Sequence, residues 1–166
     1  MQKQEVEKHF EKDIRENERL IYKVCSIYTY TDVDREDLFQ DIVIQLWKAY
    51  PKFNGQAKFS TWVYRVALNT AITGLRKQKS IIKADQPAIL AANIIDDNYN
   101  AGEEDRFQQL YTAIEQLSQV EKAIVMLYME DRPYEEMEEI LGISQGNLRV
   151  KMNRLKEKLR QHTKNM

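Results

Sequence analysis

The chain has 166 residues, 43% of them hydrophobic, which is enough to bury one sizeable core or two small ones. Its formal net charge is −1, so any surface that attracts a polyanion must be a local one. A single cysteine excludes an internal disulfide, and two histidines far apart in the sequence make no metal-ligand cluster, so we expect neither a metal nor a cofactor.

Residues 1–31 are predicted to be helical and amphipathic. Apolar side chains recur at helical spacing from Val6 and Phe10 to Ile27, and this face is expected to pack on the next helix. Cys25 lies among apolar neighbours and is expected to be an inert core thiol. The start of the chain is charged and polar and no apolar run approaches about eighteen residues, which predicts neither a signal peptide nor a membrane span and indicates a cytoplasmic location.

Residues 32–49 are predicted to form an acidic helix. Its acids crowd into its first half with a single arginine among them: Asp32, Asp34, Glu36, Asp37 and Asp41. Leu38, Ile42 and Leu46 recur at helical spacing and predict its buried face. Pro51 is expected to end the helix.

No acid occurs between Asp41 and Asp85. The basic residues of this span accumulate among aromatic ones, which suggests a surface that faces a polyanion. Ser60 is the predicted N-cap of a helix that runs to Arg76 and Lys77. Charge patterning alone favours two ordinary amphipathic helices with solvated charges, so the order of the residues has to decide.

That order resembles conserved region 2 of bacterial sigma factors of the extracytoplasmic-function (ECF) group. The resemblance rests on Asp34-x-x-Asp37-Leu38-x-Gln40-Asp41-x-x-x-x-Leu46-Trp47, on Phe59-x-x-Trp62-x-Tyr64-Arg65-x-Ala67-x-Asn69 and on Leu75-Arg76. Thr73 departs from the family pattern, which commonly has an acidic or amide residue there. The departure leaves the promoter preference open.

The resemblance implies a different role for each of the two helices. The acidic helix is implied to bind the clamp helices of the largest subunit of RNA polymerase through Asp37, Gln40, Asp41 and Trp47. The second helix is implied to melt the promoter at its −10 element, because aromatic and amide side chains capture freed bases and basic ones neutralise phosphates. The residues expected to do so are Lys58, Phe59, Trp62, Tyr64, Arg65, Asn69, Arg76 and Lys77. Burial in the core is an equally good explanation of Trp62 and Tyr64.

Helical periodicity is lost over residues 81–105, where acids, asparagines and scattered isoleucines replace it. This segment is predicted to be a flexible linker, part of which is apolar enough to dock on a domain or a partner. Because helix formers abound and no alternating β-branched run is long enough for a sheet, the predicted fold class is all-α. We expect two small helical domains, residues 1–80 and 106–166.

The last stretch carries a helix-turn-helix motif. Pro133 suits the first turn of one helix, Gly142 supplies the turn, and Ser144 caps a second helix that runs to about Arg160. The apolar positions of the second helix are expected to face inward: Leu148, Met152, Leu155 and Leu159. Such a helix can enter a major groove, where arginine pairs with guanine and asparagine or glutamine with adenine. An ordinary helical hairpin with a basic outer face is the alternative.

Residues 132–159 resemble region 4 of the same sigma family. Gly146 and Arg154 match the family's second helix, whereas several neighbouring positions are substituted. The resemblance implies contact with the −35 element, with Lys151 on phosphate. The residues expected on this surface are Gln145, Asn147, Arg149, Val150, Lys151, Asn153 and Arg154.

Together the two motifs cover most of the chain in the family's order. They imply a transcription initiation factor whose partners are core RNA polymerase, promoter DNA and, because ECF factors are commonly held inactive by one, an anti-sigma factor. No catalytic constellation is visible, so we do not expect an enzyme. A stand-alone helix-turn-helix regulator is the alternative, but it leaves the acidic and the aromatic-basic helices unexplained. A helical adaptor that binds only proteins leaves both basic surfaces without a role.

Overall fold

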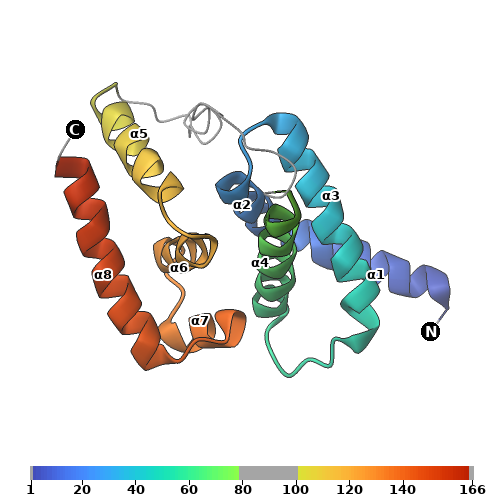
Figure 1. Cartoon of the computed structure of the whole chain (residues 1–166). Coiled ribbons are helices and arrows are strands. Elements are labelled where there is room, and N and C mark those ends of the chain that lie inside the picture. The colour runs from blue at the N-terminus through green and yellow to red at the C-terminus, as the bar shows by residue number, and fades with distance from the viewer. Residues whose placement is uncertain (1, 79–100, 165–166) are drawn as a thin grey trace. The chain divides into compact units, whose positions relative to one another are not determined.

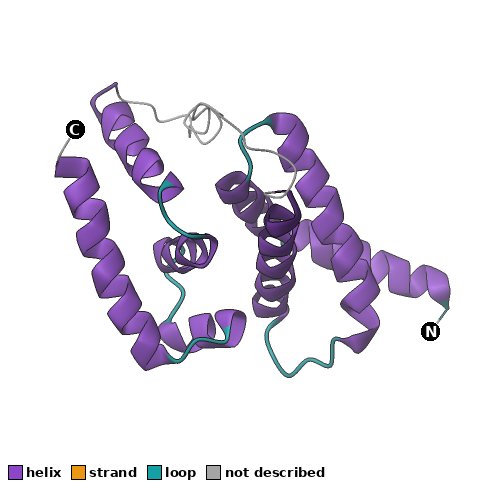
Figure 2. Ribbon diagram, viewed as in Figure 1, coloured by secondary structure: helices purple, strands orange, loops and turns teal. Residues whose placement is uncertain are grey.

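The computed structural model describes residues 2–78 and 101–164. Side chains are described except at positions 75–78, 101–105, 107, 163 and 164. The described residues form eight α-helices and one short 3-10 helix, without a strand (Figure 2). They belong to two compact helical units, so the predicted all-α fold with two helical domains is confirmed (Figure 1). None of the described helices is long and apolar enough to cross a membrane.

The first unit is a bundle built around three helices. Its elements are α1 (Lys3–Glu16), α2 (Glu18–Tyr28), α3 (Asp32–Ala49), the 3-10 helix η1 (Tyr50–Lys52) and α4 (Phe59–Gln78). Helices α2, α3 and α4 pack against one another in all three pairings, and α1 packs on α2 (Figure 1). The acidic helix stops where it was predicted to stop, because Pro51 lies in η1 and cannot continue an α-helix.

The core of this unit comes from the apolar stripes of the three central helices. Ile21 and Val24 from α2, Ile42 and Leu46 from α3, and Val63 from α4 have no exposed surface. Burying each such side chain contributes about 1.5–3 kcal/mol before conformational entropy is counted. Apolar spacing in the sequence therefore identified the inward faces of α2 and α3 correctly.

The structure adds one break to the predicted helical segment of this unit and corrects one predicted cap. Residues 1–31 form two helices, because the backbone at Asn17 (φ −114°, ψ 12°) leaves the helical region and its side-chain amide donates to the carbonyl of Asp13 at 2.8 Å. The apolar spacing continues across this break, so periodicity alone could not reveal it. Helix α4 begins at Phe59, which places Ser60 inside the first turn and not at the N-cap.

The second unit contains the helix-turn-helix. Its elements are α5 (Ala101–Glu115), α6 (Gln119–Met129), α7 (Tyr134–Leu141) and α8 (Gln145–Lys164). Helix α8 packs on all three others (Figure 1). Helix α5 begins five residues before the predicted domain start, so only the last part of the expected linker lies within the described residues. The predicted flexibility of residues 81–105 otherwise falls outside the described residues.

The turn between α7 and α8 has the predicted chemistry. Gly142 ends α7 with a φ of 70°, a left-handed conformation in which any other residue is strained. The hydroxyl of Ser144 accepts a hydrogen bond from the backbone N–H of Asn147 at 3.3 Å, as expected of an N-cap. Pro133 precedes α7 as its N-cap residue and is not in its first turn, a shift of one position from the prediction.

Candidate protein and nucleic-acid interfaces

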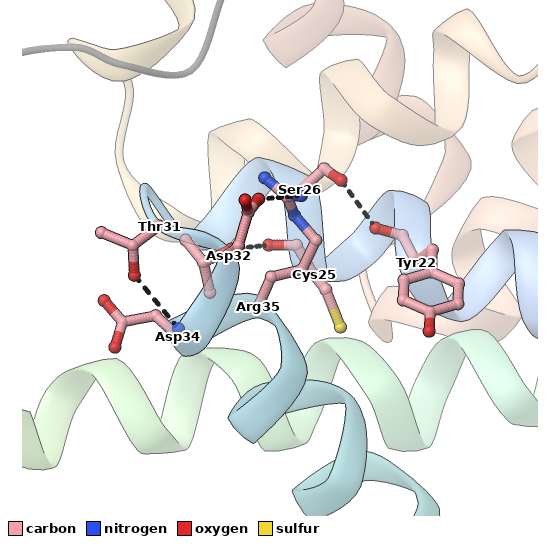
Figure 3. Close-up of polar contacts among 8 residues, drawn as sticks. Tyr22, Cys25, Ser26, Thr31, Asp32, Asp34 and Arg35 are labelled. Atoms are coloured by element: carbon pink, nitrogen blue, oxygen red, sulfur yellow. Dashed lines mark hydrogen bonds and ion pairs between the residues drawn. The ribbon is translucent and has the colours of Figure 1, made fainter. Parts of the chain in front are cut away.

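The basic residue near the start of α3, Arg35, is paired within the helix. The hydroxyl of Thr31 caps the helix by accepting a hydrogen bond from the N–H of Asp34 at 3.1 Å (Figure 3). Arg35 reaches one turn back to Asp32, with 3.0 Å between its terminal nitrogen and the carboxylate (Figure 3). The arginine side chain is only 15% exposed, while that of Asp32 is 78% exposed. Arg35 therefore offers little positive charge to solvent.

The other acids of α3 keep their charge on the surface. The exposed carboxylates that form no ion pair with a described residue are Asp34, Glu36, Asp37 and Asp41. Gln40 is exposed between them. Apart from Lys48 in the last turn of α3, a cationic partner would thus meet a helix face without an exposed base, which suits rapid, charge-steered association.

Two exposed apolar side chains extend this face beyond the predicted residues. Val33 is 71% exposed and Ile44 is 47% exposed. With Asp37, Gln40 and Trp47 they recur at spacings of four and three residues, which places all five on one face of α3. Trp47 is 38% exposed and packs edge-on against Phe10 of α1, with 4.9 Å between ring centroids. The sequence contains this second, exposed stripe, but helical spacing alone did not distinguish it from the buried stripe of the same helix.

An aromatic cluster joins the end of α3 to the start of α4. The ring of Trp62 lies 5.1 Å from Phe53 and 5.4 Å from Phe59, and Phe53 and Phe59 are 5.5 Å apart. Tyr50 contacts both Phe59 and Trp62 from η1. The four rings are partly exposed. The predicted residues Phe59 and Trp62 are thus brought together, and Tyr50 is a member of the cluster that sequence reasoning missed.

Tyr64 takes the core position that was the alternative to DNA contact. Its side chain is 1% exposed and lies in the core with Val63. Two residues along a helix point to nearly opposite sides, so Tyr64 is turned away from the face that carries Trp62. Trp62, Arg65 and Asn69 share that face at spacings of three and four residues, and Arg65 and Asn69 are exposed.

The other basic residues predicted to contact the −10 element lie just before α4 and at its end. Lys58 is exposed, and its carbonyl accepts the first helical hydrogen bond from the N–H of Trp62 at 3.1 Å. Arg76 and Lys77 are in the last turn of α4, but their side chains lie outside the described residues. From Phe59 to Gly74 the helix contains no acidic residue.

Helix α8 divides its surface into a buried face, an outer ridge and two flanks. Leu148, Met152 and Leu155 are buried as predicted, while Leu159 is half-buried. The outer ridge carries the exposed residues Val150, Asn153 and Arg154. One flank carries Asn147 and Lys151, and the other, beside α7, carries Gln145 and Arg149. All of these side chains are exposed except that of Gln145, which is half-buried.

Two family models match the chain over the two helical units. The first, described as Sigma-70 region 2, matches residues 14–81, and the second, described as Sigma-70, region 4, matches residues 107–159. The ECF RNA polymerase sigma-E factor of Escherichia coli (strain K12) is 30% identical over 153 residues, which cover 84% of this chain and 80% of that protein. The chain belongs to the ECF family of RNA polymerase sigma factors.

Further relatives agree with this assignment. The ECF RNA polymerase sigma factor SigW of Bacillus subtilis (strain 168) is 25% identical to this sigma factor over 157 residues, covering 88% of this chain and 84% of SigW. Among solved structures, the sigma factor RpoE in complex with the anti-sigma factor NepR from Bartonella quintana has the same fold, with a TM-score of 0.76 and 18% identity. That likeness covers 95% of this chain and 98% of RpoE.

Membership of the family establishes a role in transcription initiation. The stand-alone regulator is disfavoured, because residues 14–81 match region 2 in addition to the region 4 match that contains the helix-turn-helix. Most of α1 lies before the region 2 match, although its Phe10 contacts Trp47 on α3. Among the side chains that the structure describes, no group of three or more His, Cys, Asp or Glu is placed to hold a metal ion.

Proposed function

We propose that this sigma factor divides its work among three helices. Helix α3 docks on core RNA polymerase, α4 captures the melted −10 element, and α8 reads the −35 element. The observation that supports this most strongly is the separation of charge within the first unit. Four of the five exposed acids of α3, all but Asp32, form no ion pair with a described residue, whereas α4 contains no acid from Phe59 to Gly74. One packed unit thus offers one surface to a basic protein and another to nucleic acid.

Docking combines charge with apolar contact in this proposal. Asp37 and Asp41 pair with cations of the polymerase, and Gln40 supplies a hydrogen bond. Val33 and Ile44 are anchors, because exposed apolar side chains on a charged face gain free energy only when a partner covers them. Trp47 adds a large surface at the end of the same face, and aromatic residues are frequent binding hot spots.

Promoter opening rests on the face shared by Trp62, Arg65 and Asn69. An exposed aromatic surface can stack on a base that has left the duplex, and an amide can bond to its edge. Arg65 and Lys58 hold the phosphates on either side. Arg76 and Lys77 extend this role along α4. The proposal leaves Tyr64 in the core and gives Phe59 the task of supporting Trp62.

Upstream recognition falls to α8. The outer ridge and the two flanks present Asn147, Val150, Lys151, Asn153 and Arg154 together with Gln145 and Arg149. Lys151 contacts phosphate, and the arginines and amides contact base edges in the major groove. We assign residues 1–80 to docking and opening, and residues 106–166 to upstream recognition.

An anti-sigma factor is the proposed regulatory partner. The solved RpoE structure is a complex with the anti-sigma factor NepR, and we extend that type of partner to this chain. In its native cell, under conditions where its promoters are silent, this sigma factor should elute as a complex larger than its own 19.7 kDa and free of polymerase. Recovery only as free or polymerase-bound protein would contradict the proposal. As a binding protein and not an enzyme, it acts in the cytoplasm, where the polymerase is.

The proposed function is tested with purified components. The full chain is mixed with core RNA polymerase, and initiation is measured on a pool of promoter fragments from the native genome. We expect RNA from a small set of promoters that depends on the added chain. Specific DNA binding without any polymerase-dependent RNA would instead support the stand-alone regulator.

A further inference from the structure

Two contacts, one helical turn apart, join helices α7 and α8. Tyr134 and Glu138 are four residues apart on α7, and Gln145 and Arg149 are four apart on α8, so each pair lies on one face of its helix. The carboxylate of Glu138 accepts a hydrogen bond from the backbone N–H of Gln145 at 3.1 Å. The guanidinium of Arg149 lies over the ring of Tyr134, 5.1 Å from its centroid. The first contact fixes the start of α8 and the second holds a side chain one turn later.

The cation–π contact with Tyr134 suits Arg149 for reading a base. A free arginine side chain has about 2 kcal/mol of rotamer entropy to lose when it is held in one geometry. An aromatic ring under the guanidinium restricts its plane but leaves the N–H donors at its edge available. Recognition of guanine uses two such donors in that plane. A guanidinium that is already oriented loses less entropy when it binds.

We infer that Tyr134 is a positioning residue for Arg149 and thereby sets the strength of base preference at one base pair of the −35 element. This inference rests on the proposed function, in which Arg149 faces that element. Tyr134 acts through the arginine and needs no contact with a base. Glu138, one turn after Tyr134 on α7, keeps the two helices in the register that brings the ring under the guanidinium.

The second unit contains a matched control for this contact. The amine of Lys156 lies 4.6 Å from the centroid of the Tyr128 ring, which belongs to α6. The two cation–π pairs have similar cation-to-centroid distances, and their cations are seven residues apart on the same flank of α8. A lysine amine is a point charge without the planar fork of arginine, so loss of the Tyr128 ring should not change base preference.

The experiment uses the full chain assembled with core RNA polymerase and a library of promoter duplexes randomised over the upstream element. Bound duplexes are sequenced to obtain the base preference at each position. Tyr134→Leu should lower the preference at one position by about two- to fivefold, the effect of losing one exposed cation–π contact. Tyr134→Phe, which keeps a ring, should retain the preference. Tyr128→Leu should leave every position unchanged.

A double-mutant cycle decides whether Tyr134 acts through Arg149. Arg149→Ala should change the preference at the same position, and Tyr134→Leu should then add nothing. The inference would be overturned if Tyr134→Leu had an equal effect with Arg149 present and in the Arg149→Ala background, or an effect spread over all positions. Neither outcome would contradict the proposed function. An Arg149→Ala variant with unchanged preferences would instead show that the assignment of Arg149 in the proposed function is wrong. Tyr134→Met serves as a second ring-free variant if Tyr134→Leu melts early.

Discussion

The hydroxyl of Tyr50 donates a hydrogen bond of 2.8 Å to the carboxylate of Asp13, which lies 37 positions earlier in the chain. The same tyrosine ring packs edge-on against Phe10, with 5.1 Å between centroids. Burial, with a smaller contribution from Asp13, raises the pKa of Tyr50. Helix α1 is thus tied to the aromatic cluster at the start of α4, although the two are distant in sequence.

Removing this hydrogen bond should weaken the first unit without disturbing its rings. We expect Tyr50→Phe to lower the free energy of unfolding by about 1 kcal/mol, because the bond is partly buried and charge-assisted. Urea titration followed by circular dichroism measures the loss. Asp13→Asn in the Tyr50→Phe background should then cost little more. A full additional loss would mean that Asp13 stabilises the fold through some other contact.

The docking face of α3 can be tested by reversing its charge. Asp37→Lys together with Asp41→Lys should abolish binding to core polymerase yet leave the melting temperature nearly unchanged, since exposed charges contribute little to folding. Glu11→Lys, an exposed acid of α1, is the control and should bind normally. Binding is measured by co-elution on a sizing column. Normal assembly of the double variant would remove the docking assignment.

The apolar part of the same face makes a separate prediction. Ile44→Ala should weaken polymerase binding by about 1–2 kcal/mol if the partner covers this side chain, because an alanine buries less apolar surface. The fold should be almost unaffected, because the isoleucine is already 47% exposed. Titration of labelled chain with core polymerase gives the affinity. Unchanged affinity would confine docking to the charged residues.

Promoter opening and upstream recognition should respond to different substitutions. Asn69→Ala and Trp62→Ala should reduce opening by roughly 1–3 kcal/mol each while sparing upstream binding. Arg154→Ala should weaken upstream binding by about 1–3 kcal/mol but still allow opening of DNA that is already mismatched. Permanganate reactivity of unpaired thymines reports opening. Because Trp62 also supports neighbouring rings, Asn69→Ala is the cleaner variant, and normal opening with it would contradict the assignment of α4.

Gly146 offers a test in which stability and binding move in opposite directions. It lies in the first turn of α8, and a methyl group added to it would meet nothing within 4 Å. Gly146→Ala should therefore stabilise the second unit by up to about 1 kcal/mol, since alanine is the better helix former. The same methyl group would project toward DNA and should weaken upstream binding. A variant that is more stable and binds normally would show that DNA does not approach this turn.

The sequence by itself determined several helix ends, because these depend on neighbours a few residues away. The left-handed turn at Gly142, the cap at Ser144 and the end of α3 before Pro51 all followed from local backbone chemistry. Periodic apolar residues such as Ile42 likewise identified one inward face. The order of residues in the two motifs identified the family, which the comparisons confirmed.

Only the tertiary structure decided which side chains of the aromatic and charged segments reach the surface. Trp62 and Tyr64 are both large aromatic residues and lie two positions apart, yet the way α4 meets α2 and α3 buries the tyrosine and leaves the tryptophan partly exposed. The packing that leaves the side chain of Arg35 only 15% exposed decides how little of its charge is available to a partner. The ring of Tyr134 reaches Arg149 only because α7 and α8 pack together. Burial and pairing depend on the neighbouring helix, and helical spacing within one segment carries no information about that neighbour.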